Sequence, residues 1–262
     1  MFKYILILCA ASAFCTCVGT DYNRESPPSA DRVSESKENN YWITLPKSNE
    51  LVFIGVSGLQ LKPETEIAAA REDAARKASM YHGLAASFIS VQSIGTGLFD
   101  HYVDSDIRLN YDQQIEKYLD KLVFDPERDV VRTDKAVFVR FTYQTAFPGS
   151  ITYTFVKNPN GSPEWTSRRP DELGGFMTGV GFARKQARQR ETIAKSCEAA
   201  AAALVSRMST SIDTKEISAK GENATVIQEQ SSGRLSNFLV LEIWEDPESD
   251  AIWTLAIARP SR

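Results

Sequence analysis

The chain has 262 residues, a formal net charge of −4 and 24% charged residues. Because no basic block dominates the sequence, it lacks the electrostatic footprint of a nucleic-acid-binding protein, and we expect no nucleic acid among its partners. With 42% hydrophobic residues, the chain is long enough to bury a substantial core in one or two domains.

The amino terminus has the profile of a secretory signal peptide. Lys3 supplies a positive charge, and an apolar run of about a dozen residues follows it. A helix that crosses the hydrocarbon core needs about 20 residues, so the run predicts a cleaved leader over residues 1–16 in place of a permanent membrane span. We therefore expect the protein to be exported.

Three of the four cysteines lie in or directly after this run, and only Cys197 lies in the body of the chain, which argues against a disulfide framework. A cysteine at the end of an apolar leader resembles the lipobox of bacterial lipoproteins, in which the thiol is acylated and becomes the first residue. We predict lipid attachment at Cys17, with Cys15 as the alternative. The flanking Phe14 and Thr16 depart from the usual lipobox, and such loose versions resemble those of spirochaetes. In another interpretation, the cysteines are small apolar residues of a removed leader.

Residues 17–40 follow as a predicted lipid-anchored tether. Ser, Glu, Asp, Asn, Arg and Pro dominate this segment, which has hardly any apolar side chain to bury. A flexible segment of this kind spans roughly 25 Å, enough to hold a folded body clear of the lipid headgroups.

The body of the chain contains an internal repeat. Glycine-punctuated apolar strands are predicted at residues 52–58 and 176–182, with Gly55 matched to Gly179, and each precedes a long Ala-rich helix. The two helices superpose with Ile67 on Ile193, an offset two residues different from that of the glycines. The predicted buried stripes, with intervals of three and four, are Ile67, Ala70, Ala74, Ala78, Tyr81, Ala85 and Phe88, then Ile193, Cys197, Ala200 or Ala201, Leu204 and Met208.

Strands are predicted to follow each helix. Residues 87–93 and 210–219 directly continue the helices, and alternation predicts half-buried strands at 137–143 and 239–244. A last strand is predicted at 252–259, joined to its partner by the acidic turn at 245–250. These patterns predict an α+β fold of two similar modules, each a long Ala-rich helix packed on a small antiparallel sheet. The predicted boundaries are residues 41–150 for the first module, 151–172 for a linker and 173–262 for the second module.

Two segments interrupt this pattern. The first module carries an insertion at 99–124, with a second possible helix around 111–122. Residues 151–169, which contain the Asn158-Pro159-Asn160-Gly161 turn, predict another strand in the segment that joins the two modules.

The strand, the helix and a terminal pattern together resemble the LPP20-type lipoproteins. The terminal pattern is Trp244-Glu245-Asp246-Pro247 followed by the apolar residues 252–258. The similarity covers residues 179–259 by motif order and residues 55–143 less closely. It implies a palmitate-type acyl anchor, an outer-membrane or surface location, and a relation to components that support flagellar or envelope assembly. The resemblance defines no catalytic, cofactor-binding or metal-binding residues.

Few residues predict chemistry by themselves. The two histidines, His82 and His101, lack metal-ligand spacing, and Ser57 in Gly55-Val56-Ser57-Gly58 lacks the frame of a phosphate loop or a nucleophile elbow. We interpret the glycines of this segment, and those of Gly179-Val180-Gly181, as sites where another backbone or a helix lies close to the strand. Weaker candidates are a calcium loop at Asp100, Asp104 and Asp106 or at Asp246, Glu248 and Asp250, a carbohydrate platform of Trp165, Trp244 and Trp253, and a basic cluster at 184–190.

Three functional hypotheses follow. The first is a non-catalytic structural or partner-binding lipoprotein whose partners are membrane lipid and an envelope protein or a second copy of itself. The second is a binding protein for envelope glycan or another small ligand, through exposed aromatics or the basic cluster. The third is a hydrolase with an unrecognised carboxylate site, which predicts a cleft with a strongly perturbed carboxylate pKa.

Overall fold

The fold is that of a computed structural model, which describes residues 41–43, 50–95, 102–149, 151, 153, 156–208, 210–219 and 222–261. The predicted leader, the tether and the acylation site at Cys17 or Cys15 lie outside the described residues and stay predictions. Within these ranges, no helix is long and apolar enough to cross a membrane.

The described residues form an α+β fold, which confirms the predicted class. In chain order the elements are β1 (Tyr41–Ile43), β2 (Glu50–Gly58), α1 (Pro63–His82), β3 (Leu84–Gly95), β4 (Tyr102–Tyr111), α2 (Glu116–Leu119), β5 (Leu122–Val123), β6 (Val130–Arg132), β7 (Ala136–Ala146), α3 (Glu164–Ser167), β8 (Glu172–Leu173), β9 (Phe176–Arg184), α4 (Gln189–Ser206), β10 (Thr210–Ala219), β11 (Glu222–Asp246) and β12 (Ala251–Pro260).

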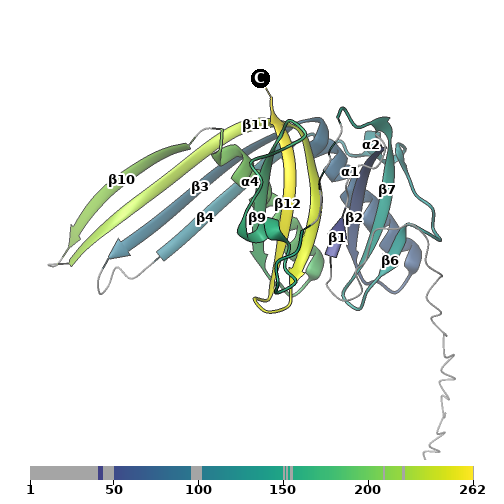
Figure 1. The fold of residues 1–262 in the computed structure, drawn as a ribbon, viewed down its shortest axis with the longest axis horizontal. Helices are drawn as coiled ribbons and strands as arrows, with labels where there is room; N and C mark the ends of the chain where they lie inside the picture. The colour runs from purple at the N-terminus through teal and green to yellow at the C-terminus, as the bar shows by residue number, and fades with distance from the viewer. Residues whose placement is uncertain are drawn as a thin grey trace, which may run out of the picture.

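The strands form two antiparallel sheets (Figure 1). The larger sheet has the order β4-β3-β11-β12-β9-β8, and both β1 and β10 also pair with β11. The smaller sheet has the order β2-β7-β5, and β6 also pairs with β7. The predicted antiparallel sheets are therefore present, but β3 and β4 from the first half of the chain belong to the same sheet as the strands of the second half.

Helix α1 packs on the smaller sheet through a face of small side chains. Pro63 stands in the first turn, where its missing N–H leaves no helical hydrogen bond unmade. The helix ends at His82, and the Gly83 N–H donates to the Ser79 carbonyl at 3.2 Å. The buried apolar residues of the helix are Ala70, Ala74, Ala75, Ala78 and Tyr81. The predicted continuation of the stripe through Ala85 and Phe88 is wrong, because both residues lie in β3.

Helix α4 packs on β9 and β12 in the same manner. The predicted stripe from Ile193 to Leu204 is buried, while Met208 lies just beyond the last helical residue, Ser206. The Ser196 and Thr254 hydroxyls lie 2.6 Å apart, which joins the buried face of the helix to β12. Burial also raises the pKa of the Cys197 thiol to about 11, so this cysteine is a poor nucleophile in the folded protein.

Glycines allow each helix to lie against its strand. A Cβ on Gly55 would lie 1.9 Å from the Ala70 carbonyl oxygen, and one on Gly181 would lie 2.0 Å from the Ser196 carbonyl oxygen. The predicted close approach at these glycines is confirmed. Gly179, which the sequence matched to Gly55, also lies close to α4, since its Cβ would be 2.5 Å from the Ala200 carbonyl oxygen. Gly181 is the glycine that stands at the same separation from Gly55 as Ile193 from Ile67.

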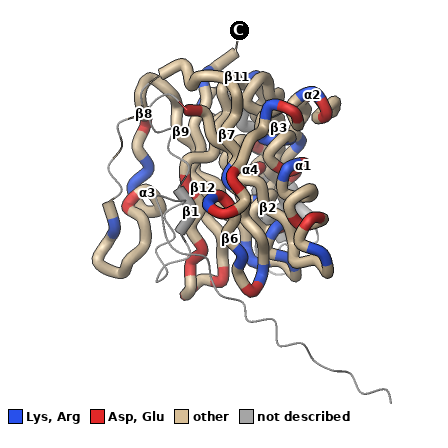
Figure 2. Tube along the Cα trace, turned by 90° about the vertical axis from the view of Figure 1, so that its right-hand side faces the viewer, with Lys and Arg blue, Asp and Glu red and all other residues tan. Residues whose placement is uncertain are grey.

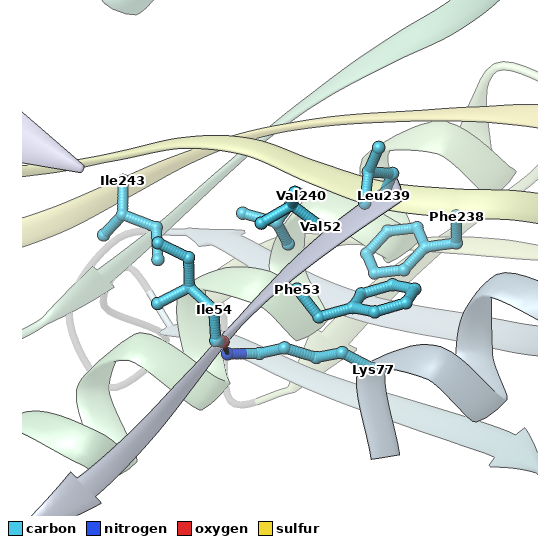
Figure 3. A pocket seen from close by; sticks show the side chains of 8 residues that line it. All are labelled: Val52, Phe53, Ile54, Lys77, Phe238, Leu239, Val240 and Ile243. Atoms are coloured by element: carbon cyan, nitrogen blue, oxygen red, sulfur yellow. Dashed lines mark hydrogen bonds between the residues drawn. The ribbon is translucent and has the colours of Figure 1, made fainter. Parts of the chain in front are cut away.

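The two halves of the chain share their hydrophobic cores. Figure 3 shows the contact between the smaller and the larger sheet, where side chains of β2 face side chains of β11 and Lys77 lies beside them. The Lys77 ammonium donates to the Ile54 carbonyl at 2.6 Å and to the Asp73 carboxylate at 2.8 Å. The cavity left there is about 10 Å³, roughly the space of one water molecule. This contact between the two sheets is therefore a packed interface and not a ligand site.

Strands and short helices occupy the described parts of the predicted insertion and the predicted linker. In the insertion, the described residues include β4, a strand of 10 residues, and the helix expected around 111–122 is only the four residues of α2. In the linker, the described residues contain an isolated bridge between Lys157 and Pro163, the short helix α3 and the short strand β8. Tertiary pairing with β3 decides the conformation of β4.

Candidate functional site: a projecting four-stranded blade

Four strands extend beyond the body of the molecule and form what we call the blade. The blade consists of β4, β3, residues 222–235 of β11, and β10, in that order across the sheet. Figure 1 shows these strands projecting to one side, away from both long helices. All neighbouring strands in the blade are antiparallel.

The blade is made of two hairpins of equal length. In the first, β3 and β4 form ten residue pairs that begin with Leu84 opposite Tyr111. In the second, β10 and β11 form ten residue pairs that begin with Thr210 opposite Ser231. Leu84 and Thr210 stand at the same sequence separation as Ile67 and Ile193 in the helices. Each hairpin therefore starts at the same point relative to the preceding helix.

The base of the blade is packed against the body. Leu84 and Leu235 are buried opposite each other, and Gly233 lies against the end of Met208, where an added Cβ would be 3.3 Å from the Met208 methyl carbon. On β4, Leu109 is partly buried whereas its neighbours along the strand are exposed. The body therefore holds the blade at one end, next to α4.

Strand β11 passes from the blade into the body through two irregularities. Its pairing with β12 shifts register between Ser236 and Leu239 and again between Val240 and Glu242. Asn237 lies within the first shift, between Ser236 and Leu239, and has a φ of 55°, a left-handed conformation that asparagine tolerates better than most residues. Such bulges bend and twist a strand, and here they allow one strand of 25 residues to serve both parts.

The two outer strands of the blade each have one free side among the described residues. Strand β4 pairs with β3 alone, and β10 pairs with β11 alone. A free strand side presents unpaired backbone N–H and C=O groups, which can bind another strand. The sequence predicted a strand at 210–219, and this is confirmed, but it predicted no strand at 102–111.

A second candidate is a hollow of about 570 Å³ beside the β11–β12 turn. Trp244 and Trp253 line it, together with residues 158–162. The Asn158 side-chain amide holds this loop in place by donating to the Ser162 hydroxyl at 2.9 Å. This arrangement combines aromatic faces with amide and hydroxyl groups, so the glycan-binding hypothesis applies to it and stays a prediction.

Trp165 does not belong to the predicted carbohydrate platform. It is 1% exposed, and its indole N–H donates to the carboxylate of Glu242, which is fully buried. Burial raises the pKa of Tyr153, and the nearby charge of Glu242 raises it further. Trp165 therefore anchors its segment on β11, and the platform predicted from three tryptophans is reduced to Trp244 and Trp253.

The basic cluster at 184–190 forms the entry to α4. Figure 2 shows Lys and Arg interspersed with Asp and Glu on the side of the molecule that it presents. Lys185 lies 3.1 Å from the Glu245 carboxylate and 2.7 Å from that of Asp250. Glu245 is 5% exposed and also accepts from Gln189 at 2.7 Å and pairs with Lys135 at 3.1 Å. Part of the cluster is thus occupied by internal ion pairs.

The remaining predicted residues are dispersed. Ser57 is fully buried in β2. The His82 ring stacks on the Tyr118 ring with centroids 5.4 Å apart, and its Nε2 forms a hydrogen bond with the Tyr143 hydroxyl at 3.0 Å. Asp100 and His101 lie outside the described residues. Among the residues that the structure describes, no group of three or more His, Cys, Asp or Glu side chains is placed to hold a metal ion.

The fold and this geometry define an α+β protein with a projecting antiparallel blade. Comparisons of the chain with protein-family models, with curated proteins and with solved structures found no match.

Proposed function

We propose that the protein is an exported bacterial envelope lipoprotein whose folded body is a non-catalytic, partner-binding module. The acylated residue in this proposal is Cys17, and residues 18–40 tether the body to the outer membrane. The observation that carries the partner-binding role is the blade, because its two outer strands, which project away from the helices, each have one side without a partner among the described strands. Strand addition to a free edge is a common mode of protein recognition.

The proposal includes an internal duplication, with β2, α1, β3, β4 and β7 corresponding to β9, α4, β10, β11 and β12. The start of each helix supports it. The residues before the helices are extended at Lys62 and Arg188, with ψ of 124° at both. The backbone N–H of Gln60 donates to the Glu66 carboxylate at 2.8 Å, and that of Gln186 donates to the Thr192 hydroxyl at 2.8 Å. The matching glycine contacts and hairpin starts support it further.

The lipid anchor is tested by acylation of the full chain in a bacterial host that processes lipoproteins. We expect the wild type to incorporate radiolabelled palmitate and to partition into detergent, and we expect Cys17→Ala to lose both properties. Cys15→Ala is the matched control and should behave as the wild type. An unlabelled, aqueous wild type would contradict the anchor, and loss in Cys15→Ala alone would move it to Cys15.

Partner binding by the blade is tested with a photo-crosslinking amino acid at Asp106. This residue is exposed on β4. We expect irradiation of cells to produce an adduct between the protein and another polypeptide at this position. The control position is Leu61, which is fully exposed in the turn before α1 and should give no adduct. An equal yield at both positions, or none at Asp106, would contradict a role for the blade in partner binding.

A further inference from the structure

We propose that the partner of the blade is a second copy of the same chain, and that β10 of one copy pairs with β4 of the next. The inference rests on the proposed function and on the proposed duplication. It names the partner and the register, which the proposed function leaves open.

The chain already contains one junction of this kind. Strand β3 of the first hairpin pairs with β11 of the second hairpin over twelve residue pairs, from Gly95 opposite Ala224 to Leu84 opposite Leu235. The junction joins two hairpins in the same orientation, because β3 follows β4 across the sheet just as β10 follows β11. It also carries charged residues, among them Glu229 and Arg234, so charges on a strand do not prevent pairing of this type.

The free sides of the blade correspond to the two strands of this junction. In the duplication, β10 takes the place of β3, and β4 takes the place of β11. The side of β3 that pairs with β11 corresponds to the side of β10 that has no partner among the described strands. In the same way, the side of β11 that accepts β3 corresponds to the free side of β4. A second copy therefore repeats a junction that the sequence forms within one chain.

The internal junction also predicts the register between copies. Ile89 lies opposite Gln230 and Ser90 lies opposite Glu229. Counting from the first pair of each hairpin, Lys215 takes the place of Ile89, and Asn110 takes the place of Gln230. The expected pairs between copies are therefore Lys215 with Asn110 and, next to it, Glu216 with Leu109.

This contact is head to tail, because it joins two different edges. Repetition of such a contact builds a closed ring or an open filament, whereas a contact between two identical edges stops at a dimer. A lipid anchor on each copy would hold the copies in one plane, with their blades at a common height above the membrane. The assembled blades would form one continuous antiparallel sheet.

The test is disulfide cross-linking of the full chain in membranes with Lys215→Cys and Asn110→Cys. Within one chain, these positions lie on opposite edges of a four-stranded sheet, which separates them by at least roughly 14 Å at normal strand spacing. They are also eight residues out of line along the strands, because the residue of β4 level with Lys215 is Tyr102. A disulfide needs Cα atoms within about 7 Å, so any bond between them must join two chains. Cys197 is buried with a raised thiol pKa and does not compete.

The double variant should give a ladder of dimers, trimers and higher species after oxidation. Each single variant alone should give no band above the parent chain, and the two single variants expressed together should give dimers only. Because neighbouring pairs in an antiparallel ladder alternate between wide and narrow spacing, Glu216→Cys with Leu109→Cys is tested as well. The register control is Lys215→Cys with Asp106→Cys, which should not form a ladder.

Three results would overturn the inference. The first is no ladder from either pair while the variants melt at the same temperature as the parent. The second is a dimer from Lys215→Cys alone, which would indicate pairing of identical edges. The third is an adduct from Asp106 with a polypeptide of another sequence and none with this chain. That third result would leave the proposed function intact, whereas no adduct at all would contradict both.

Discussion

Gly55→Ala is expected to lower the free energy of unfolding by about 3 kcal/mol or more, at the upper end of what overpacking costs. The added methyl would lie 1.9 Å from the Ala70 carbonyl oxygen and 2.7 Å from the carbonyl carbon. Both are backbone atoms, so relief requires α1 to move away from β2. That movement would open the contact between the helix and the smaller sheet, which is visible as a lower denaturation midpoint.

The matched control is Gly58→Ala on the same strand. A Cβ there meets no atom within 4 Å, so the change should leave the denaturation midpoint within the range of ordinary surface substitutions, about 0.5 kcal/mol. Gly181→Ala is the corresponding change on β9 and should resemble Gly55→Ala, because its Cβ would lie 2.0 Å from the Ser196 carbonyl oxygen. A mild effect at Gly55 with a severe one at Gly58 would contradict the packing.

Trp165→Ala is the second change for which we expect a large loss, about 3–5 kcal/mol. The side chain is 1% exposed, so truncation leaves a cavity, and the Glu242 carboxylate loses its indole donor. Residues 156–170 should then release from β11. Limited proteolysis would detect this as a new cleavage in that segment, together with a lower thermal midpoint.

Trp165→Phe separates the two contributions. It keeps most of the buried ring volume and removes the indole N–H, so we expect a loss of about 1–3 kcal/mol from the weakened satisfaction of the buried carboxylate. Proteolysis of the segment should then stay close to that of the parent. Equal losses for Trp165→Phe and Trp165→Ala would show that the hydrogen bond, and not the packing, holds the segment.

Several elements were predictable because their signals are local. The helix beginning at Gln189 follows from the spacing of Ile193, Cys197 and Leu204, which places them on one face. Residues 137–143 and 252–259 are rich in β-branched, aromatic and other apolar residues, and both lie within strands. Helical periodicity failed beyond Gly83, because Ala85 and Phe88 match the spacing of the stripe by chance after the helix has ended.

The blade could be predicted only in part. Residues 210–219 follow a helix and read as a strand, but Tyr102 to Tyr111 contains scattered charged residues and weak alternation. Its ten residues are extended because they pair with β3, and no nearby sequence signal specifies that partner. The close contact of Gly181 with α4 was likewise hidden, since two glycines in that strand could be matched to Gly55.

The sequence by itself determined which segments become α1, α4, β7 and β12. Only the tertiary structure decided that the two hairpins join into one blade and that β11 bends at Asn237 to serve both the blade and the body. The physical reason is the distance along the sequence over which each signal acts. Periodicity is set by neighbours within a few turns or residues, whereas strand pairing between Leu84 and Leu235 depends on packing and register across the whole chain.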